Sequence, residues 1–153
     1  MDLAETTSYL HRHIPITSHL GAVVESYDGF EVCISAPLAP NLNHRKTAFG
    51  GSMSALAILA GWTLLHLKLR EEGLNTRLVI QKSGFDFSLP IESDFKAVGV
   101  MPSEESWERF LKILRRRGRA RIRVGSRIEG AGRRGGAHEG VYVASLIEEG
   151  KAP

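Results

Sequence analysis

Residues 48–72 read AFGGSMSALAILAGWTLLHLKLREE, and no residue from Ala48 to Leu67 is charged. The length of this apolar run matches a membrane span. Polar side chains interrupt it, however, and no second hydrophobic span or aromatic belt accompanies it. Small residues recur at helical spacing and form one stripe: Gly50, Ser54, Ala57 and Gly61. These residues therefore predict a buried core helix from Gly51 to about Glu72, which a sheet approaches closely, and no membrane partner.

Two further helices are predicted, one before and one after the core helix. Asp2, with Glu5 three residues later, is typical of a capping box, and Ile14-Pro15 ends the short helix that it begins. Ser103 caps a later helix that ends at Gly118. The apolar residues of this later helix have the spacing of one helix face: Trp107, Phe110, Leu111 and Leu114.

Six segments have the composition of β-strands: Gly21–Tyr27, Phe30–Ala36, Thr76–Pro90, Asp94–Met101, Arg119–Ile128 and Val141–Ile147. Asp28-Gly29 favours a tight two-residue turn between the first two strands. The alternation of the third strand changes phase near Gly84, which predicts a bulge or a close backbone approach there. Five glycines in Glu129–Gly140 predict a loop before the last strand.

These elements predict an α+β protein with a hot-dog architecture. An antiparallel sheet would wrap around the long central helix, with an N-terminal helix and a second helix before the last two strands. The chain has 153 residues and shows neither an internal repeat nor a domain linker. We therefore expect a single domain over residues 1–153.

Composition and charge restrict the classes of function. With 42% hydrophobic and 24% charged residues, the chain has the composition of a globular protein, not of a disordered or disulfide-stabilised one. A single cysteine, Cys33, and acidic residues in place of a signal peptide favour the cytoplasm. Residues 1–100 carry a net charge of −2 and residues 101–153 a net charge of +5, which indicates an acidic partner for the C-terminal third.

Several motifs resemble the YiiD C-terminal domain family of thioesterase-like proteins. They are Pro40-Asn41-Leu42-Asn43-His44, Thr47-Ala48-Phe49-Gly50-Gly51-Ser52, Ala55-Leu56-Ala57 and Ala60-Gly61-Trp62. Ser83, Asp86–Pro90 and Trp107–Arg121 are also similar, so the likeness covers most of the chain. The resemblance implies a hot-dog homodimer, or a dimer of dimers, that acts on acyl groups carried by coenzyme A or an acyl carrier protein.

The junction between the polar loop and the core helix is the predicted thioester site. The amides of Gly50, Gly51 and Ser52 lack acceptors within the helix, and the helix dipole adds positive charge there. Such fixed donors stabilise the oxyanion that develops on a thioester carbonyl. Because of the resemblance, Asn41 and Phe49 join Gly50 and Gly51 as substrate-binding candidates. The alternative is that the two glycines only permit a tight turn.

Hydrolysis also needs a group that orients or deprotonates water. Hot-dog thioesterases similar to this chain place a carboxylate or another polar group about two turns after the Gly-Gly pair. This sequence has Ala57-Ile58-Leu59 there, and no acid occurs between Gly51 and Lys68. The remaining catalytic candidates are Asn43, His44, Ser52 and Asp86, and the strand after the helix adds Gln81 and Ser83 as substrate-binding candidates. The missing carboxylate keeps open a second function, a non-catalytic module that binds acyl-CoA or an acyl carrier protein.

Three of the catalytic candidates also have a structural interpretation. Asp86 lies between two phenylalanines, a setting that would suit a catalytic group if it is buried, or it lies on a solvated strand face. His44 is either a base or a loop histidine. Ser52 has no Gly-x-Ser-x-Gly elbow around it, and capping of the helix would explain it.

Six arginines fall within Arg115–Arg123. Arg119, Arg121 and Arg123 share one strand face, where their mutual repulsion favours anions such as coenzyme A phosphates or the acidic surface of a carrier protein. Nucleic acid is a third alternative, although no aromatic residue is interleaved with the arginines. The histidines near the N-terminus have no cysteine or acidic residue spaced to complete a metal site, so neither a metal nor a cofactor is expected.

Overall fold

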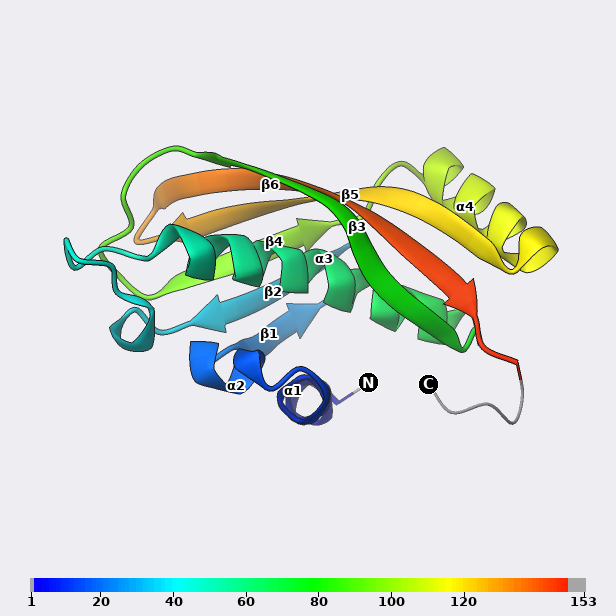
Figure 1. Ribbon diagram of the computed structural model, residues 1–153, viewed down its shortest axis with the longest axis horizontal. Coiled ribbons are helices and arrows are strands. Elements are labelled where there is room, and N and C mark those ends of the chain that lie inside the picture. Colours follow the sequence, from blue (N-terminus) through cyan, green and yellow to red (C-terminus); the bar gives the residue numbers. More distant parts are fainter. Residues whose placement is uncertain (1, 149–153) are drawn as a thin grey trace.

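The computed structural model describes residues 2–148, which form a six-stranded antiparallel sheet curved around one long helix (Figure 1). The strands are β1 Val23–Tyr27, β2 Glu31–Ala36, β3 Thr76–Phe87, β4 Phe95–Val100, β5 Arg119–Gly130 and β6 Arg133–Leu146, in the order β1-β2-β4-β5-β6-β3. The helices are α1 Leu3–His13, α2 Ile16–Leu20, α3 Gly50–Glu71 and α4 Glu104–Arg117, with a short 3-10 turn, η1, at Ala39–Asn41. This is the α+β hot-dog arrangement, and the predicted fold class is confirmed.

The central helix α3 supplies much of the hydrophobic core. Its fully buried side chains include Leu56, Ala57, Ala60, Leu64 and Leu65. By length and composition α3 could cross a membrane, and 67% of its most apolar window is buried inside the protein. Burial of these apolar side chains between helix and sheet is the main force that holds the two together. The predicted core helix is confirmed.

The backbone of α3 comes unusually close to the sheet at Ala60 and Gly61. A Cβ atom on Gly99 of β4 would stand 2.9 Å from the carbonyl oxygen of Ala60. A Cβ atom on Gly61 would overlap the ring of Tyr142 on β6. Glycine at positions 61 and 99 therefore sets the distance between helix and sheet, and the close approach expected from the small-residue stripe is confirmed at Gly61.

The helix caps agree with the sequence analysis. The Asp2 carboxylate accepts the amide of Ala4 at 2.8 Å and begins α1, and Ile14 ends it. Ser103 caps α4, which ends at Gly118 in the left-handed conformation, with φ 74°. The short helix α2 was not predicted.

The loop predicted for Glu129–Gly140 is wrong. The strands β5 and β6 continue through this segment and pair with each other as far as Gly130 and Arg133. Only Ala131 and Gly132 form the turn, with φ values of 50° and 72°. Positive φ at both central residues is the requirement of a two-residue hairpin turn.

The glycines of β6 make room for side chains instead of making the chain flexible. A Cβ atom on Gly136 would overlap the ring of Phe85 on the neighbouring strand. A Cβ atom on Gly140 would stand 2.9 Å from Cε1 of His138. Glycines within a strand can mark such close approaches. The sequence alone favours a loop here, because the rings that fill the space belong to residues at other positions.

Two smaller predictions also need correction. The bulge of β3 lies between Ile80 and Lys82, not near Gly84. The connection between β1 and β2 spans the three residues 28–30, because β1 ends at Tyr27 and β2 begins at Glu31. The Asp28 carboxylate accepts the amides at positions 30 and 31 at 2.8 and 2.7 Å, which stabilises this longer turn over the expected two-residue one.

We expect Gly99→Ala to lower the free energy of unfolding by about 1–3 kcal/mol, because the added methyl group pushes against the rigid backbone of α3. The matched control is Gly84→Ala on β3, where the nearest atom would be 4.0 Å from the new Cβ. Its effect should stay within about 0.5 kcal/mol. Urea unfolding of the two variants measures the difference, and equal effects would show that Gly99 does not set the helix position.

Candidate functional site

The helix α3 begins without a side-chain cap. Its N-cap residue is Phe49, and among the described residues no acceptor receives the amides of Gly50, Gly51 and Ser52. Gly51 is exposed, and Gly50 and Ser52 are half-buried. Unpaired amides at a helix N-terminus stabilise negative charge, so this end of α3 can accept an anion or a developing oxyanion.

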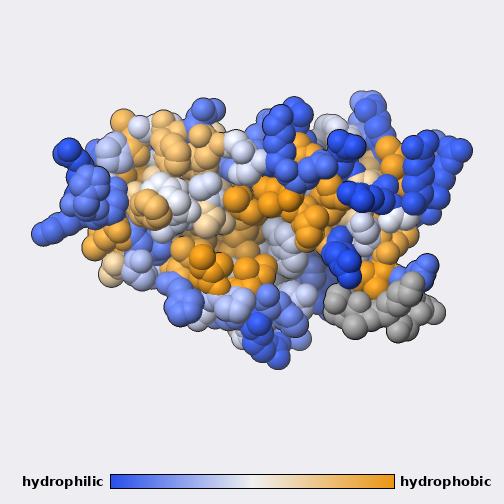
Figure 2. Space-filling view, viewed as in Figure 1, coloured by the Kyte–Doolittle hydropathy of each residue, from blue (hydrophilic) through white to orange (hydrophobic). Residues whose placement is uncertain are grey.

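Exposed apolar side chains flank these amides. The ring of Phe49 lies against Gly51 and the ring of Phe87 lies against Gly50, yet the two phenylalanines remain 55% and 57% exposed. The adjoining segments add two more exposed apolar side chains, Leu42 and Leu89. Figure 2 shows hydrophobic atoms grouped along the middle of this face, over α3 and β3. Polar donors beside apolar surface suit a ligand with a carbonyl group attached to an apolar chain.

Asn41 and Asn43 hold the loop that precedes α3. The side chain of Asn41 is buried, and its Nδ2 donates to the carbonyl groups of Leu20 and Pro37 at 2.9 and 2.8 Å. Asn43 donates to Thr47 Oγ1 at 2.7 Å, and its Oδ1 accepts the Thr47 amide at 3.1 Å. Asn41 thus ties the loop to the end of α2, and Asn43 closes the loop on itself. Contact of either side chain with substrate stays a prediction.

No hydrogen bond or ion pair joins His44, Ser52 and Asp86 within residues 2–148. His44 is exposed in the loop, and Ser52 lies in the first turn of α3. Asp86 is exposed and lies between Phe85, which packs against the core, and Phe87, which packs against Gly50. Its own side chain therefore points to the opposite face of the strand. The apolar burial considered for Asp86 is not found in the single chain. The catalytic roles of all three residues stay predictions.

The inner face of β3 continues the site away from the helix end. Ser83, Phe85 and Phe87 alternate along the strand after its bulge and share this face. The rings of Phe85 and Phe87 are 4.4 Å apart between centroids. Ser83 is exposed, and its Oγ is 2.8 Å from Nε2 of His138 on β6. The structure therefore joins a predicted site residue to a histidine.

His138 is a candidate site residue that the sequence does not predict. It is 3% exposed, and burial lowers the pKa of its imidazole. Its Nδ1 has no hydrogen-bond partner among the described residues, and the same holds for Oγ of Ser126, the residue opposite it on β5. A buried polar atom without a partner costs about 1–3 kcal/mol, so these two atoms need an explanation. In a strand, the alternation of Gly136, His138 and Gly140 would indicate that the His138 side chain points toward the core. The predicted loop for this segment hides that signal.

The basic residues of β5 lie on the outer face of the sheet. Arg119 and Arg121, with Arg117 and Gln81, line a groove of ≈ 390 Å³ that has no acidic residue in its lining. Arg123 instead pairs with Glu139 at 3.3 Å, and both side chains are exposed, so this ion pair is weak. Of the three predicted arginines, Arg119 and Arg121 thus line a groove without acidic residues, and Arg123 forms an ion pair with Glu139.

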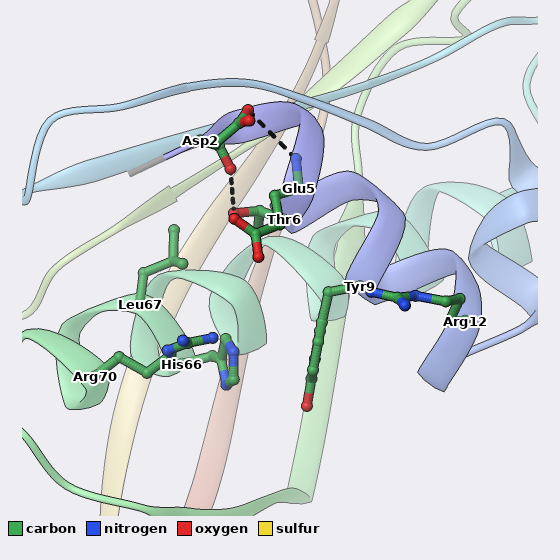
Figure 3. Close-up of a pocket in the computed structure, with 8 residues that line it drawn as sticks. All are labelled: Asp2, Glu5, Thr6, Tyr9, Arg12, His66, Leu67 and Arg70. Atoms are coloured by element: carbon green, nitrogen blue, oxygen red, sulfur yellow. Dashed lines mark hydrogen bonds between the residues drawn. The ribbon is translucent and has the colours of Figure 1, made fainter.

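A second pocket lies between α1 and α3 (Figure 3). Its volume is ≈ 350 Å³, and its lining residues are Asp2, Glu5, Thr6, Tyr9, Arg12, His66, Leu67 and Arg70. The ring of His66 stacks between Tyr9 and Trp62, with centroid distances of 5.1 and 4.8 Å. His66 is about 24 Å along α3 from Gly50, so this pocket is separate from the helix N-terminus.

Burial, with smaller contributions from Arg70 and His13, lowers the pKa of His66 from 6.5 to about 4. The unfolded chain therefore binds an additional proton at this residue between these pH values, and the free energy of unfolding should fall as the pH is lowered through this window. We expect His66→Phe, which keeps an aromatic ring in the stack, to reduce this dependence. Urea unfolding at a series of pH values measures it, and an identical slope in both proteins would contradict the prediction.

Comparison with known proteins gives the same fold. A family model described as "Putative thioesterase (yiiD_Cterm)" matches residues 3–146. A solved structure of a protein of unknown function from Chlorobaculum tepidum TLS is 29% identical, with a TM-score of 0.88 and 94% of each chain covered.

Two more distant structures show the fold alone. One is a thioesterase from Shewanella oneidensis, called putative in its description, with 23% identity, a TM-score of 0.83, and 94% of this chain and 96% of that chain covered. The other is a thioesterase from Haemophilus influenzae, with 15% identity, a TM-score of 0.75, and 99% of this chain and 96% of that chain covered. Because the family match spans nearly the whole chain, this protein belongs to the YiiD C-terminal domain family of thioesterase-like proteins.

Proposed function

We propose that this protein binds an acyl thioester at the N-terminus of α3 and hydrolyses it to a free acid and a thiol. The observation that carries the proposal is the set of unpaired amides at Gly50–Ser52, with the exposed rings of Phe49 and Phe87 beside them. The amides would hold the carbonyl oxygen, and the rings would contact the acyl chain or the thioester arm. The carrier would be coenzyme A or an acyl carrier protein.

The same amides would lower the barrier to hydrolysis. Attack of water on the thioester carbon moves negative charge onto the carbonyl oxygen, which then accepts stronger hydrogen bonds than it does in the substrate. One well-placed donor of this kind contributes about 2.7–4 kcal/mol to stabilising the transition state. No rearrangement is needed at the moment of reaction, because the helix backbone already holds the donors in place.

Two copies of the chain would join through β3. This strand is at the edge of the sheet, is 12 residues long and exposes Val79 by 51% and Phe87 by 57%. A long edge strand with exposed apolar side chains and unpaired backbone groups is a template for pairing with another strand. Antiparallel pairing of two β3 strands would place the α3 N-terminus of each copy beside the subunit boundary.

This pairing would also explain the basic groove. Along the sheet, Arg119 lies at the Arg77 end of β3, at the opposite end from Phe87. In an antiparallel β3 pair, the Arg77 end of one copy lies beside the Phe87 end of the other. Arg119 and Arg121 would then lie at the same end of the joined sheet as the partner's thioester site, although on its outer face. There they could hold the phosphates of a coenzyme A arm that passes around this end of the sheet, or an acidic carrier protein docked at it.

We expect the protein in solution to have twice the mass of its 16.8 kDa chain, as measured by light scattering. In the dimer, the backbone amides on the free edge of β3 form hydrogen bonds with the partner strand. Hydrogen exchange should therefore be slow at alternate residues of β3, whose amides would be exposed to water in a monomer. A monomeric mass over a wide concentration range, with fast exchange at these amides, would contradict the β3 interface.

Thiol release from a panel of acyl-CoA and acyl-carrier-protein substrates tests the function. We expect turnover by the parent protein and a decrease in kcat of about 10²–10³-fold in Gly50→Pro, which removes one amide donor at a position where helices tolerate proline. Gly50→Ala is the matched control, because it adds a side chain beside Phe87 and keeps the amide; it should retain most of the activity.

Binding measurements beside this assay identify the alternatives. Binding of acyl-CoA without turnover would select the non-catalytic module. Binding of an oligonucleotide at physiological salt, without affinity for coenzyme A, would select nucleic acid as the partner.

His44→Ala and Asp86→Ala, assayed beside the parent, test whether either exposed side chain takes part. Replacing Arg119, Arg121 and Arg123 together should raise KM in a salt-dependent manner.

A further inference from the structure

We infer that Ser83 and His138 together activate the water that hydrolyses the thioester, with Ser83 in contact with the water and His138 as the proton acceptor behind it. This inference rests on the proposed thioester site and supplies the water-activating group that α3 lacks. The observation that carries it is the hydrogen bond of 2.8 Å between Ser83 Oγ and His138 Nε2. The serine is exposed and the histidine buried, so the serine hydroxyl is the outer member of the pair.

The pair lies opposite the part of α3 where a carboxylate is missing. Ile58 is about two turns after Gly50, and its carbonyl oxygen accepts the Tyr142 hydroxyl at 2.9 Å. At the other end of this segment, the ring of Phe87 contacts Gly50. Ser83 lies between these two contacts on the sheet, opposite Gly140, which precedes Tyr142 on the inner face of β6. The sheet therefore presents a proton acceptor to the section of helix that carries none.

The water route sets where the thioester carbon has to lie. Ser83 and Phe87 are four positions apart on β3, which corresponds to about 13 Å between their Cα atoms. One water molecule spans only about 6 Å between the serine oxygen and the carbon that it attacks. The thioester carbon would therefore lie over the inner face of β3 between Phe87 and Ser83, with its oxygen toward the α3 amides.

The surroundings of His138 suit a proton acceptor. Burial, opposed only by the weaker effect of Glu139, lowers the pKa of the imidazole, so the ring is neutral near neutral pH and its free nitrogen can accept a proton. A neutral imidazole has one protonated nitrogen, and Nδ1 must carry that proton if Nε2 accepts from Ser83. Nδ1 has no hydrogen-bond partner among the described residues, and the unpaired Oγ of Ser126, directly opposite on β5, is an acceptor that could take its proton. Gly140 leaves the space that the imidazole occupies.

The proton path closes without any other reactant. The water oxygen attacks the thioester carbon as one water proton passes to Ser83 Oγ and the serine proton passes to His138 Nε2. The carbon–sulfur bond then breaks, and its electron pair leaves with the sulfur. The proton on His138 returns through Ser83 to the thiolate, which leaves as the thiol beside the free acid, and both side chains recover their starting state.

The test uses the full chain and an acyl-CoA that the parent hydrolyses. We expect Ser83→Ala to lower kcat by about 10²–10⁴-fold, as loss of a general base does, while the variant stays folded at the assay temperature. Ser83→Thr keeps a hydroxyl group on a strand and should restore most of the rate. Ser145→Ala, on the other face of the sheet, is the matched control and should leave the rate unchanged.

His138→Asn retains a polar group near Ser83 but cannot accept a proton. In the parent, kcat should fall as the pH is lowered below the ordinary histidine pKa of 6.5, because protonated His138 no longer accepts a proton. This acidic limb should be lost in His138→Asn, together with most of the rate. If this buried substitution prevents folding, the pH profile of the parent and the Ser83 variants decide.

Several results would overturn the inference. Parent-like turnover by Ser83→Ala would reject the pair while the proposed thioesterase function stands. An acyl adduct on Ser83, detected by intact mass after rapid quenching, would replace the water route with direct attack by serine. Binding of acyl-CoA by a parent that releases no thiol from any substrate would reject hydrolysis, and the role of the pair with it.

Discussion

The contact between the backbone of α3 and the inner face of the sheet is the constraint on which the other features depend. Gly99 of β4 meets the carbonyl group of Ala60, and the Tyr142 ring fills the space that a side chain at Gly61 would need. This contact sets the distance of α3 from the sheet and the rotation of α3 about its own axis. The Tyr142 hydroxyl, bound to the Ile58 carbonyl, fixes the helix along its length. The unpaired amides at Gly50 and Gly51 consequently stand at a defined place beside β3.

The chemistry that we propose for the site is divided between helix and sheet. The helix provides backbone donors, which need no titratable side chain and so tolerate the apolar sequence that the core requires. The sheet provides Ser83 and His138, whose hydrogen bond crosses from β3 to β6. In this arrangement a residue on the buried helix does not have to carry a charge, which would be costly in such apolar surroundings.

The outcome of each prediction follows from the range of the interactions involved. The core helix, its small-residue stripe and the caps at Asp2, Ser103 and Gly118 depend on near neighbours in the chain, and they were predicted correctly. The glycine-rich segment at 129–140 is predicted as a loop, but it forms strand. Gly136 leaves space for the ring of Phe85 on β3, and Gly140 leaves space for the ring of His138, and these contacts form only in the folded sheet. The bulge of β3 was misplaced because its position is set by pairing with β6.

The sequence by itself determined the fold class, the family resemblance and the amide donors at the start of α3, because helical periodicity and the Phe49–Ser52 motif are local patterns. Only the tertiary structure revealed the partner of Ser83, the division of the arginines by the Arg123–Glu139 pair, and the exposed edge of β3. These features depend on which strands are adjacent and on the register between them. A residue 55 positions away in the chain becomes a hydrogen-bond partner only when the sheet assembles.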